Sequence, residues 1–384
     1  MPFEFATATR ILFGAGTLAQ IGSLAREMGA RALVVTGSNP ERAGRLLDRF
    51  AGQGLTALLF PVAQEPTVET VRLGTEIARH SRCDVVIGFG GGSALDAGKA
   101  IAALLTNGGD PLDYLEGIGA GKALSHPSAP YIAIPTTAGT GAEVTRNAVL
   151  GSPAHRVKVS LRSPHMLPRL ALIDPELTYG LPPALTVTTG LDALTQLIEP
   201  YVSNRANPMT NLFCREGIRR FARSFRRAYA HGDDAAARED MALVSLYGGL
   251  ALANARLGAV HGFAGPLGGM VSAPHGALCA RLLPVVMAVN LRALRERAPE
   301  SPVLTRYEEV ARLLTSDPTA TADAGVAWIQ ALSSDLPIPA LRAYGLTSAE
   351  FPLLIQKAAK ASSMQGNPIL LTEREREEIL QGAL

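Results

Sequence analysis

The sequence of 384 residues predicts an α/β region with a parallel sheet, residues 1–180, followed by an all-helical region, residues 181–384. Three observations carry this prediction. Short runs of Val, Ile and Leu alternate with amphipathic helical patterns in the first half, as in parallel sheets that helices cover on both faces. After Pro175 the periodicity becomes long and helical. The composition, 47% hydrophobic and 18% charged, is that of a globular chain with a well-buried core.

The predicted strands of the α/β region are short apolar runs that end at glycine, proline or polar residues. They are residues 32–36, 55–60, 84–88 and 131–135. Helical periodicity before and between them covers residues 18–28, 41–50, 68–81 and 94–105. The pattern is shorter and irregular over residues 149–173. In the all-helical region, the predicted helices are residues 191–202, 208–231, 236–256, 284–297, 307–314, 322–333, 348–361 and 372–383.

The net charge of +2 comes from interspersed acidic and basic residues, so there is no basic tract for nucleic acid, and aromatic residues are few for base stacking. Three scattered cysteines without a CxxC pair argue against a disulfide framework and a structural zinc site. The N-terminus lacks the pattern of a signal peptide, and no apolar run looks long enough to span a bilayer. We therefore expect a soluble cytoplasmic protein without nucleic-acid or membrane partners.

A glycine-rich loop follows the strand at residues 84–88 and precedes a helix. The loop consists of Gly90, Gly91, Gly92 and Ser93. Glycines let the backbone approach a pyrophosphate, and the helix N-terminus presents free N–H groups to it. The loop matches neither GxGxxG nor GxxxxGK(S/T), so a tight structural turn is the alternative. Polar side chains at Ser93 and Asp96 favour the anion-binding interpretation.

A second polar loop follows the strand at residues 131–135. It carries three threonine hydroxyls and two glycines, which suits a cofactor crevice at the carboxyl edge of a parallel sheet. The threonines are Thr136, Thr137 and Thr140. A local turn closed by the threonine hydroxyls is the alternative.

A third strand end lies at Gly37, Ser38 and Asn39, where NAD-specific enzymes place an acidic residue on the ribose 2′-hydroxyl. No Asp or Glu stands there, and Arg42 and Arg45 follow on the next helix. The pattern favours NADP(H) over NAD(H). A solvated helix face is the alternative explanation for both arginines.

Two histidines, His261 and His275, lie in an apolar, glycine-rich stretch of the helical region. Pro266 and Pro274 predict that any helix between them is interrupted, so that the imidazoles belong to separate elements. A buried imidazole needs a partner, which can be a backbone carbonyl, a carboxylate or a metal. Two satisfied core histidines are the alternative.

Asp192 and Gln196 are four residues apart in a predicted helix and therefore share one face. This face offers one carboxylate oxygen and one amide oxygen to a metal. The alternative is an aspartate near the first helical turn, where the helix dipole favours it, and an exposed glutamine.

Together these segments resemble the iron-containing (group III) alcohol dehydrogenase family over nearly the whole chain. The matching stretches are residues 90–99, 135–143, 189–194, 261–268 and 274–276, with residues 11–16 and 366–368. The resemblance implies a Rossmann-like dinucleotide-binding domain, a helical metal-binding domain, and an active site in the cleft between them. This is the dehydroquinate synthase-like architecture.

The resemblance makes Asp192, His261 and His275 ligands of a divalent metal. The fourth family ligand, a histidine one turn after the aspartate, is here Gln196, and a relay histidine that many members carry is here Gly265. Fe²⁺ is the expected ion, with Zn²⁺ and Mn²⁺ as alternatives, because an amide oxygen is a weaker and harder ligand than imidazole.

The implied chemistry is hydride transfer between NAD(P) and a small alcohol or aldehyde, with the metal as Lewis acid on the substrate oxygen. The catalytic residues would be Asp96, His261 and His275, with Asp96 near the nicotinamide. Lys158 resembles a cofactor position, or is a solvated charge beside Arg156. A homodimer or larger assembly is typical of the family.

Three competing interpretations remain open at this stage. Gln196 and Gly265 shift the sequence towards the maleylacetate reductases, close relatives that lack a full ligand set and act without metal. Dehydroquinate synthase-like lyases share the architecture but need more basic residues than the sequence offers. A non-enzymatic binding protein that kept the fold is the third.

Three arginines could meet an acidic substrate: Arg156, Arg162 and Arg256.

Overall fold

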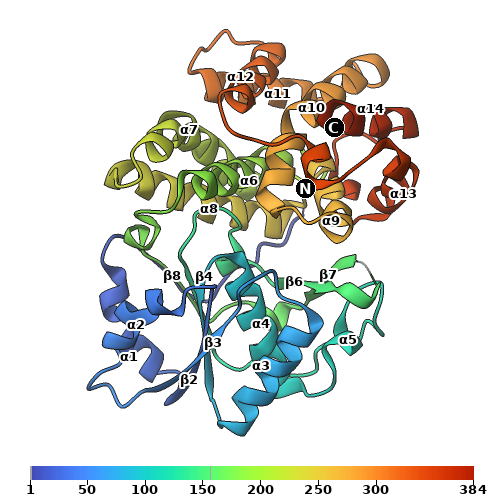
Figure 1. Ribbon diagram of the computed structural model, residues 1–384. Coiled ribbons are helices and arrows are strands. Elements are labelled where there is room, and N and C mark those ends of the chain that lie inside the picture. Colours follow the sequence, from blue (N-terminus) through green and yellow to red (C-terminus); the bar gives the residue numbers. More distant parts are fainter. Residues whose placement is uncertain (1, 156) are drawn as a thin grey trace. The chain divides into compact units, whose positions relative to one another are not determined.

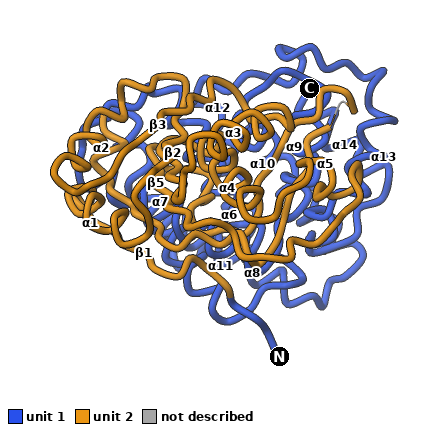
Figure 2. Tube along the Cα trace, turned by 90° about the horizontal axis from the view of Figure 1, so that it is seen from below, with its two compact units in different colours: residues 1–5, 180–384 blue, residues 6–179 orange. Residues whose placement is uncertain are grey.

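The computed structural model describes residues 2–155 and 157–384 (Figure 1). Its contacts divide the chain into two compact units, which we number in chain order: the first is Ala6–Tyr179 (orange, unit 2 in the key of Figure 2), and the second is Gly180–Leu384 with residues 2–5 (blue, unit 1 in that key). Arg156 lies outside the described residues. We keep the predicted domain boundaries, residues 1–180 and 181–384, as a proposal, since compact units are not by themselves independently folding domains.

The first unit contains the predicted parallel sheet, which is confirmed. Six strands pair in the order β1-β8-β5-β4-β2-β3, and every neighbouring pair is parallel. They are β1 (Ile11–Phe13), β2 (Arg31–Thr36), β3 (Thr56–Pro61), β4 (Val85–Gly90), β5 (Tyr131–Pro135) and β8 (Leu170–Ile173). The carboxyl ends of β2, β4 and β5 are neighbours, so the three loops that follow them meet at one edge.

Helices cover both faces of this sheet, and alternate residues of each strand enter two separate cores. Leu33 and Val35 of β2 face the core with α3 (Val68–His80) and α4 (Gly92–Asn107). Ala32 and Val34 face the core with α1 and α2. The remaining elements are α1 (Ile21–Arg26), α2 (Gly44–Asp48), α5 (Pro111–Tyr114), and an antiparallel hairpin of β6 (Asn147–Ser152) and β7 (Val157–Arg162).

Short 3-10 helices complete both units. They are η1 (Thr17–Gln20), η2 (Pro40–Ala43), η3 (Ala142–Val144), η4 (Pro153–His155), η5 (Pro164–Met166), η6 (Pro175–Thr178), η7 (Leu341–Tyr344), η8 (Ser348–Glu350) and η9 (Met364–Gly366).

A buried lysine ties the segment after β5 to α4. The Lys99 Nζ atom donates hydrogen bonds to Ala142 O at 2.7 Å, Asn147 O at 2.8 Å and Thr145 Oγ1 at 2.9 Å. All three ammonium protons therefore have acceptors, which a fully buried lysine requires. The bonds hold the end of the threonine loop against α4, the helix that carries the glycine loop.

Glu143 makes the stability of this unit depend on pH. Burial raises the pKa of Glu143 to about 7, and its Oε2 atom has no hydrogen-bond partner among the described residues. Because the folded pKa lies above the unfolded one, the stabilisation from protonated Glu143 is full below about pH 4.5. It is lost as the pH rises through about 7.

We expect Glu143→Gln to flatten this dependence, since the amide stays neutral throughout. The variant should gain up to about 3 kcal/mol over the natural chain between pH 5 and pH 7.5. Urea unfolding of the two proteins at several pH values measures the difference. Burial lowers the pKa of Lys99 to about 8, so its own titration stays above most of this window. Parallel pH curves for the two proteins would contradict the assignment.

The described residues of the second unit form helices joined by turns and loops, with no strand among them, as predicted (Figure 1). Its helices are α6 (Pro183–Val202), α7 (Pro208–Ala230), α8 (Ala235–Ala255), α9 (Ala259–Met270), α10 (His275–Arg297), α11 (Val303–Thr315), α12 (Ala322–Ser334), α13 (Phe351–Lys360) and α14 (Glu373–Ala383).

Three predicted helix boundaries are wrong, and in α9 and α10 the reason is that the helix tolerates a proline in its interior. Helix α9 continues through Pro266, and α10 starts at His275 and contains Pro284, whereas the prediction began at residue 284. Helix α6 starts eight residues before the predicted residue 191, at Pro183, the helix position where a missing N–H is harmless. Asp192 therefore lies well inside α6 and not in its first turn.

Helix α10 also corrects the expectation about apolar runs. It has a mean hydropathy of 1.6 over its best window, so by length and composition it could cross a membrane, and α8 with α9 would pass as a bent pair. However, 78% of that window of α10 is buried within the protein. This is the pattern of a central helix in a folded core.

Candidate metal and cofactor sites

Four side chains from three helices of the second unit converge on one point. They are Asp192 on α6, His261 on α9, and His275 and Cys279 on α10, and their ligating atoms all lie within 4.8 Å of one another. The Nε2 atoms of His261 and His275 lie 3.3 and 3.9 Å from Asp192 Oδ1. The Cys279 Sγ atom lies 3.8 and 3.6 Å from the same two nitrogens.

Two oxygens at this cluster are buried without a hydrogen-bond partner among the described residues, Asp192 Oδ1 and Gln196 Oε1. An unsatisfied buried acceptor costs about 1–3 kcal/mol, and more when it is charged. A cation between the carboxylate and the two imidazoles would satisfy Asp192 Oδ1. The donor set therefore fits a divalent metal ion.

Glu199, which the sequence reasoning missed, orients the first histidine. Its Oε2 atom lies 2.6 Å from His261 Nδ1, and its Oε1 atom accepts a 2.7 Å hydrogen bond from Val260 N. A proton held on Nδ1 leaves Nε2 free to bind a metal, as in the carboxylate–histidine–metal arrangement of many metalloproteins. Glu199 is seven residues after Asp192 and thus on the same face of α6, a spacing visible in the sequence.

The first turn of α9 is fixed by a buried asparagine pair. Asn367 Oδ1 accepts hydrogen bonds from Ala259 N and from Asn290 Nδ2, both at 3.1 Å, and Asn367 Nδ2 donates to Asn290 Oδ1 at 2.8 Å. Ala259 is two residues before His261. The pair thus positions the backbone from which His261 projects.

The start of α10 touches α6 directly because residue 276 has no side chain. A β-carbon on Gly276 would lie 2.3 Å from Thr188 O, a backbone atom that cannot move aside. This close approach brings His275 and Cys279 to the level of Asp192. Glycine is required here by space and not by backbone angles.

The charges of the cluster follow from these contacts. Burial would raise the pKa of Asp192, but the contact with His261 and the charge of His275 outweigh burial and lower it. Burial would likewise lower the pKa of His275, whereas the attraction of the Cys279 sulfur and of Asp192 raises it to about 9. A metal ion would displace the protons held here, so its affinity should increase with pH.

The glycine loop of the first unit forms a cradle with the threonine loop. A β-carbon on Gly92 would lie 2.8 Å from Thr140 Cγ2, and one on Gly91 would lie 3.4 Å from Thr137 Oγ1. Gly91 is the N-cap of α4, and no side chain caps the helix there. Its first N–H groups are therefore available to an anion, which fits the pyrophosphate of a dinucleotide.

The β2 end borders the same cradle. A β-carbon on Gly90 would lie 3.2 Å from Gly37 N, whereas one on Gly37 would meet nothing within 4 Å. Asn39 caps the following 3-10 helix by accepting from Glu41 N. Arg42 donates to Leu177 O at 3.1 Å, while Arg45 is exposed.

Two further predicted site residues have partners within their own unit. Asp96 Oδ2 accepts a 3.0 Å hydrogen bond from Val149 N, which joins α4 to the β6–β7 hairpin. Lys158 on β7 forms an ion pair with Glu65. Neither contact tests the predicted role of these two residues at the cofactor. The arginines considered for an acidic substrate are also paired: Arg162 with Glu116, and Arg256 with Gln365.

A parallel sheet with a glycine loop at an uncapped helix N-terminus, and a buried cluster of oxygen, nitrogen and sulfur donors, fit the class of metal-dependent enzymes that use a nicotinamide dinucleotide. Two descriptions of one protein family match the sequence. The description "Iron-containing alcohol dehydrogenase" matches residues 8–175, and "Fe-containing alcohol dehydrogenase family, C-terminal" matches residues 186–384. The chain belongs to the iron-containing alcohol dehydrogenase family.

Individual relatives match over almost their whole length. 1,3-Propanediol dehydrogenase of Citrobacter freundii is 36% identical, over 99% of this chain and 98% of its own. Alcohol dehydrogenase 4 of Schizosaccharomyces pombe is 38% identical, over 97% and 87%. The crystal structure of a 1,3-propanediol oxidoreductase superposes over both full chains with a TM-score of 0.92 at 34% identity. The chain is thus an oxidoreductase acting on CH–OH groups, and its family implies NAD(H) and a divalent metal.

Proposed function

We propose that the chain transfers hydride between NAD(P)(H) and a small alcohol or aldehyde at a divalent ion held by Asp192, His261 and His275. The observation that carries this proposal is the buried Asp192 Oδ1 atom, which has no hydrogen-bond partner among the described residues and lies 3.3 and 3.9 Å from two imidazole nitrogens. The bound ion would supply Lewis acidity to the substrate oxygen. Gln196, one turn along α6, lines the same site.

The other proposed roles concern binding and orientation. Glu199 holds the His261 ring with Nε2 towards the ion, and the uncapped N-terminus of α4 binds the pyrophosphate. A further set of polar groups would contact the cofactor: Gly37, Ser38, Asn39, Gly91, Gly92, Ser93, Asp96, Thr136, Thr137, Thr140 and Lys158. Within it we assign Asp96 to the nicotinamide end.

The substrate class is proposed to be short alcohols, diols and their aldehydes. This follows the named activity of the relatives, 1,3-propanediol dehydrogenase among them. The open space at Gly265, where an added β-carbon meets nothing within 4 Å, is consistent with it, because a relay histidine of other members would occupy part of that space. A water or a ribose hydroxyl would then carry the proton.

The cofactor is proposed to be NADP(H) in preference to NAD(H), because no carboxylate stands at the end of β2. We expect Gly37→Asp to shift the kcat/KM ratio towards NADH by about 100-fold. A carboxylate there accepts from the ribose 2′-hydroxyl and repels a 2′-phosphate. A β-carbon at Gly37 would meet nothing within 4 Å. Steady-state kinetics with both cofactors gives the ratio.

Gly37→Asn is the matched control, since it has the shape of aspartate without the charge. Its cofactor ratio should stay close to that of the natural chain. Equal ratios for the aspartate and asparagine variants would contradict the proposed position of the ribose.

A compartment and an assembly state belong to the same proposal. All three cysteines are free, which suits the reducing cytoplasm. A homodimer or larger assembly, which is typical of the family, is part of the proposal, and light scattering would measure it.

The function is tested with a panel of short alcohols and aldehydes and with NADH and NADPH, before and after chelation. Turnover that chelation removes and a divalent ion restores is the expected result. Turnover that survives complete metal removal would instead favour the metal-independent, maleylacetate reductase-like alternative. Cofactor binding without turnover on any substrate would indicate a binding protein.

A further inference from the structure

The amide of Gln196 is oriented as a support for Asp192 and not as a ligand. It donates a hydrogen bond to the Asp192 carboxylate, one of the contacts that lower the pKa of Asp192. Its Oε1 atom faces the neighbouring helix α8 and would lie 3.7 Å from a β-carbon on Gly248. Related enzymes have a histidine ligand at the position of Gln196. If Gln196 does not bind the ion, one protein ligand is missing from the site.

Cys279 is the fourth side chain of the cluster that can bind a metal ion. It lies four residues after His275 on α10, so both side chains project from one helix face. Its thiol is fully buried. The sulfur contacts the Nε2 atoms of His261 and His275 and not only apolar groups, which distinguishes it from a cysteine that merely fills space.

Three of the four separations described above lie within about 0.2 Å of the edges of a tetrahedral metal site, and the fourth, from His275 Nε2 to Asp192 Oδ1, is longer at 3.9 Å. With Zn–S of about 2.3 Å and Zn–N of about 2.05 Å, a tetrahedral angle puts sulfur and nitrogen about 3.6 Å apart. The observed separations from Cys279 Sγ are 3.6 Å to His275 Nε2 and 3.8 Å to His261 Nε2. Nitrogen and carboxylate oxygen should be about 3.4 Å apart. The separations of His261 and His275 from Asp192 Oδ1 are 3.3 and 3.9 Å.

We propose that Cys279 is the fourth protein ligand of this metal site, and that the resulting carboxylate, two-imidazole and thiolate set selects Zn²⁺ over Fe²⁺. A thiolate is a soft ligand that favours zinc, and Zn²⁺ also binds a given set of ligands more tightly than Fe²⁺ does. The proposal rests on the proposed function only in that the site holds a divalent ion.

The geometry leaves one side of the ion accessible. The His275 side chain keeps 38% of its surface exposed, whereas Asp192 and His261 are almost fully buried. Zinc with four protein ligands can expand to five-coordination, so a substrate oxygen can approach from the His275 side. A zinc site with four protein ligands is thus compatible with catalysis.

The test uses the full chain and measures metal coordination and metal affinity instead of activity. The zinc-loaded protein should show one sulfur at about 2.3 Å in X-ray absorption. After exchange to Co²⁺, thiolate-to-metal charge-transfer absorption is expected in the near ultraviolet. Cys279→Ser and Cys279→Ala should lose this absorption and weaken Zn²⁺ binding, in competition with a chelator, by about 100-fold or more. Protein supplied with equal Fe²⁺ and Zn²⁺ should retain Zn²⁺.

Cys214→Ala is the matched control, because it removes an equally buried thiol from α7, outside the cluster. It should keep the absorption, and so should Gln196→Ala. Absence of sulfur from the coordination shell of the natural protein would overturn the ligand assignment even if the variants fail to fold. Preferential retention of Fe²⁺ would overturn the metal assignment. Protein that binds no divalent ion at all would overturn the proposed function itself.

Discussion

Replacing His261 with alanine is expected to remove the bound divalent ion and to lower alcohol turnover by about 1,000-fold or more, equivalent to about 4 kcal/mol of transition-state stabilisation. His261 is buried, and its Nε2 atom lies 3.3 Å from Asp192 Oδ1. Its loss removes one metal ligand and also leaves Glu199 buried without its imidazole partner. Metal content per chain and kcat with saturating cofactor measure the two effects.

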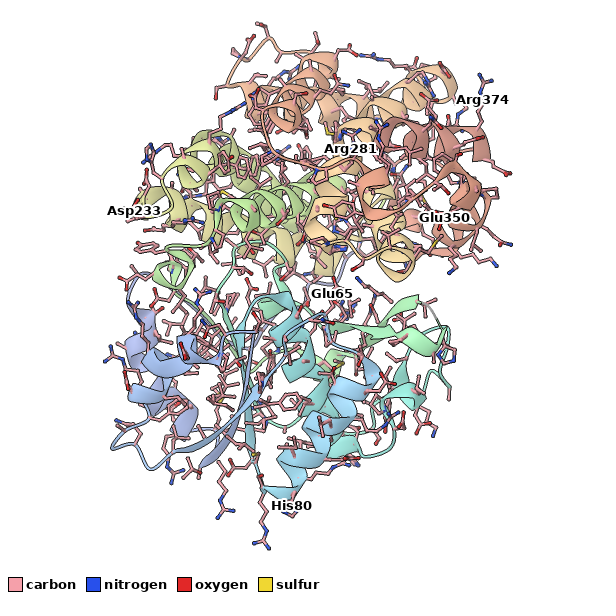
Figure 3. All side chains as sticks on the ribbon, viewed as in Figure 1. Glu65, His80, Asp233, Arg281, Glu350 and Arg374 are labelled. Carbon is pink, nitrogen blue, oxygen red and sulfur yellow. The ribbon has the colours of Figure 1, made fainter. Side chains whose placement is uncertain are left out.

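His275→Ala provides a second test of the metal site that does not depend on the folding of His261→Ala. Its side chain is more exposed, so we expect the same loss of metal with less loss of stability. His80, which projects into solvent at the end of α3, supplies the control: His80→Ala should retain both metal and turnover (Figure 3). A metal-free His261→Ala protein that stayed fully active would refute the assigned chemistry.

Placing aspartate at Gly91 is expected to abolish dinucleotide binding without weakening the fold. Gly91 is the N-cap of α4 with extended backbone angles, φ −77° and ψ −173°, which any residue adopts. Aspartate is a favoured N-cap, so stability should change by only about a few tenths of a kcal/mol. The same carboxylate would face the cofactor phosphates, and like-charge contact of this kind costs several kcal/mol. We expect Kd for NADPH to rise about 100-fold or more.

Gly91→Ser separates the charge from the β-carbon. A β-carbon at this position would meet Thr137 at 3.4 Å, an ordinary contact, so the serine variant should bind NADPH within about tenfold of the natural chain. Fluorescence titration gives Kd, and thermal unfolding checks the fold. An unchanged Kd in the aspartate variant would mean that the pyrophosphate does not bind at the α4 N-terminus.

The sequence predicts the sheet well wherever hydrophobic runs are long enough to be distinctive. Strands β2, β4 and β5 each contain five or six buried or mostly buried residues, and their alternation with helices was sufficient for the prediction. Strand β1 has only three residues and no buried one, so its pairing with β8 depends on long-range contacts that periodicity does not report. Proline misled the helical boundaries, since packing in α9 and α10 outweighs the lost backbone hydrogen bond.

The metal cluster shows a different limit. Asp192, His261 and His275 could be named from motifs, but Cys279 could not, because scattered cysteines without a CxxC spacing argue against a thiolate site. Its spacing of four from His275 was visible, yet only the folded chain brings its sulfur within 3.6 Å of that ring. The role of Glu199 could not be predicted from the sequence either, because it depends on the contact with His261, which lies on another helix.

The asparagine pair has a consequence for retention of the ion. The turn that carries His261 is held by Asn367, which lies 108 residues after Ala259 in the sequence. A protease that cuts between α9 and Asn367 would separate this support from the helix, and release of the segment is therefore expected to release the ion as well.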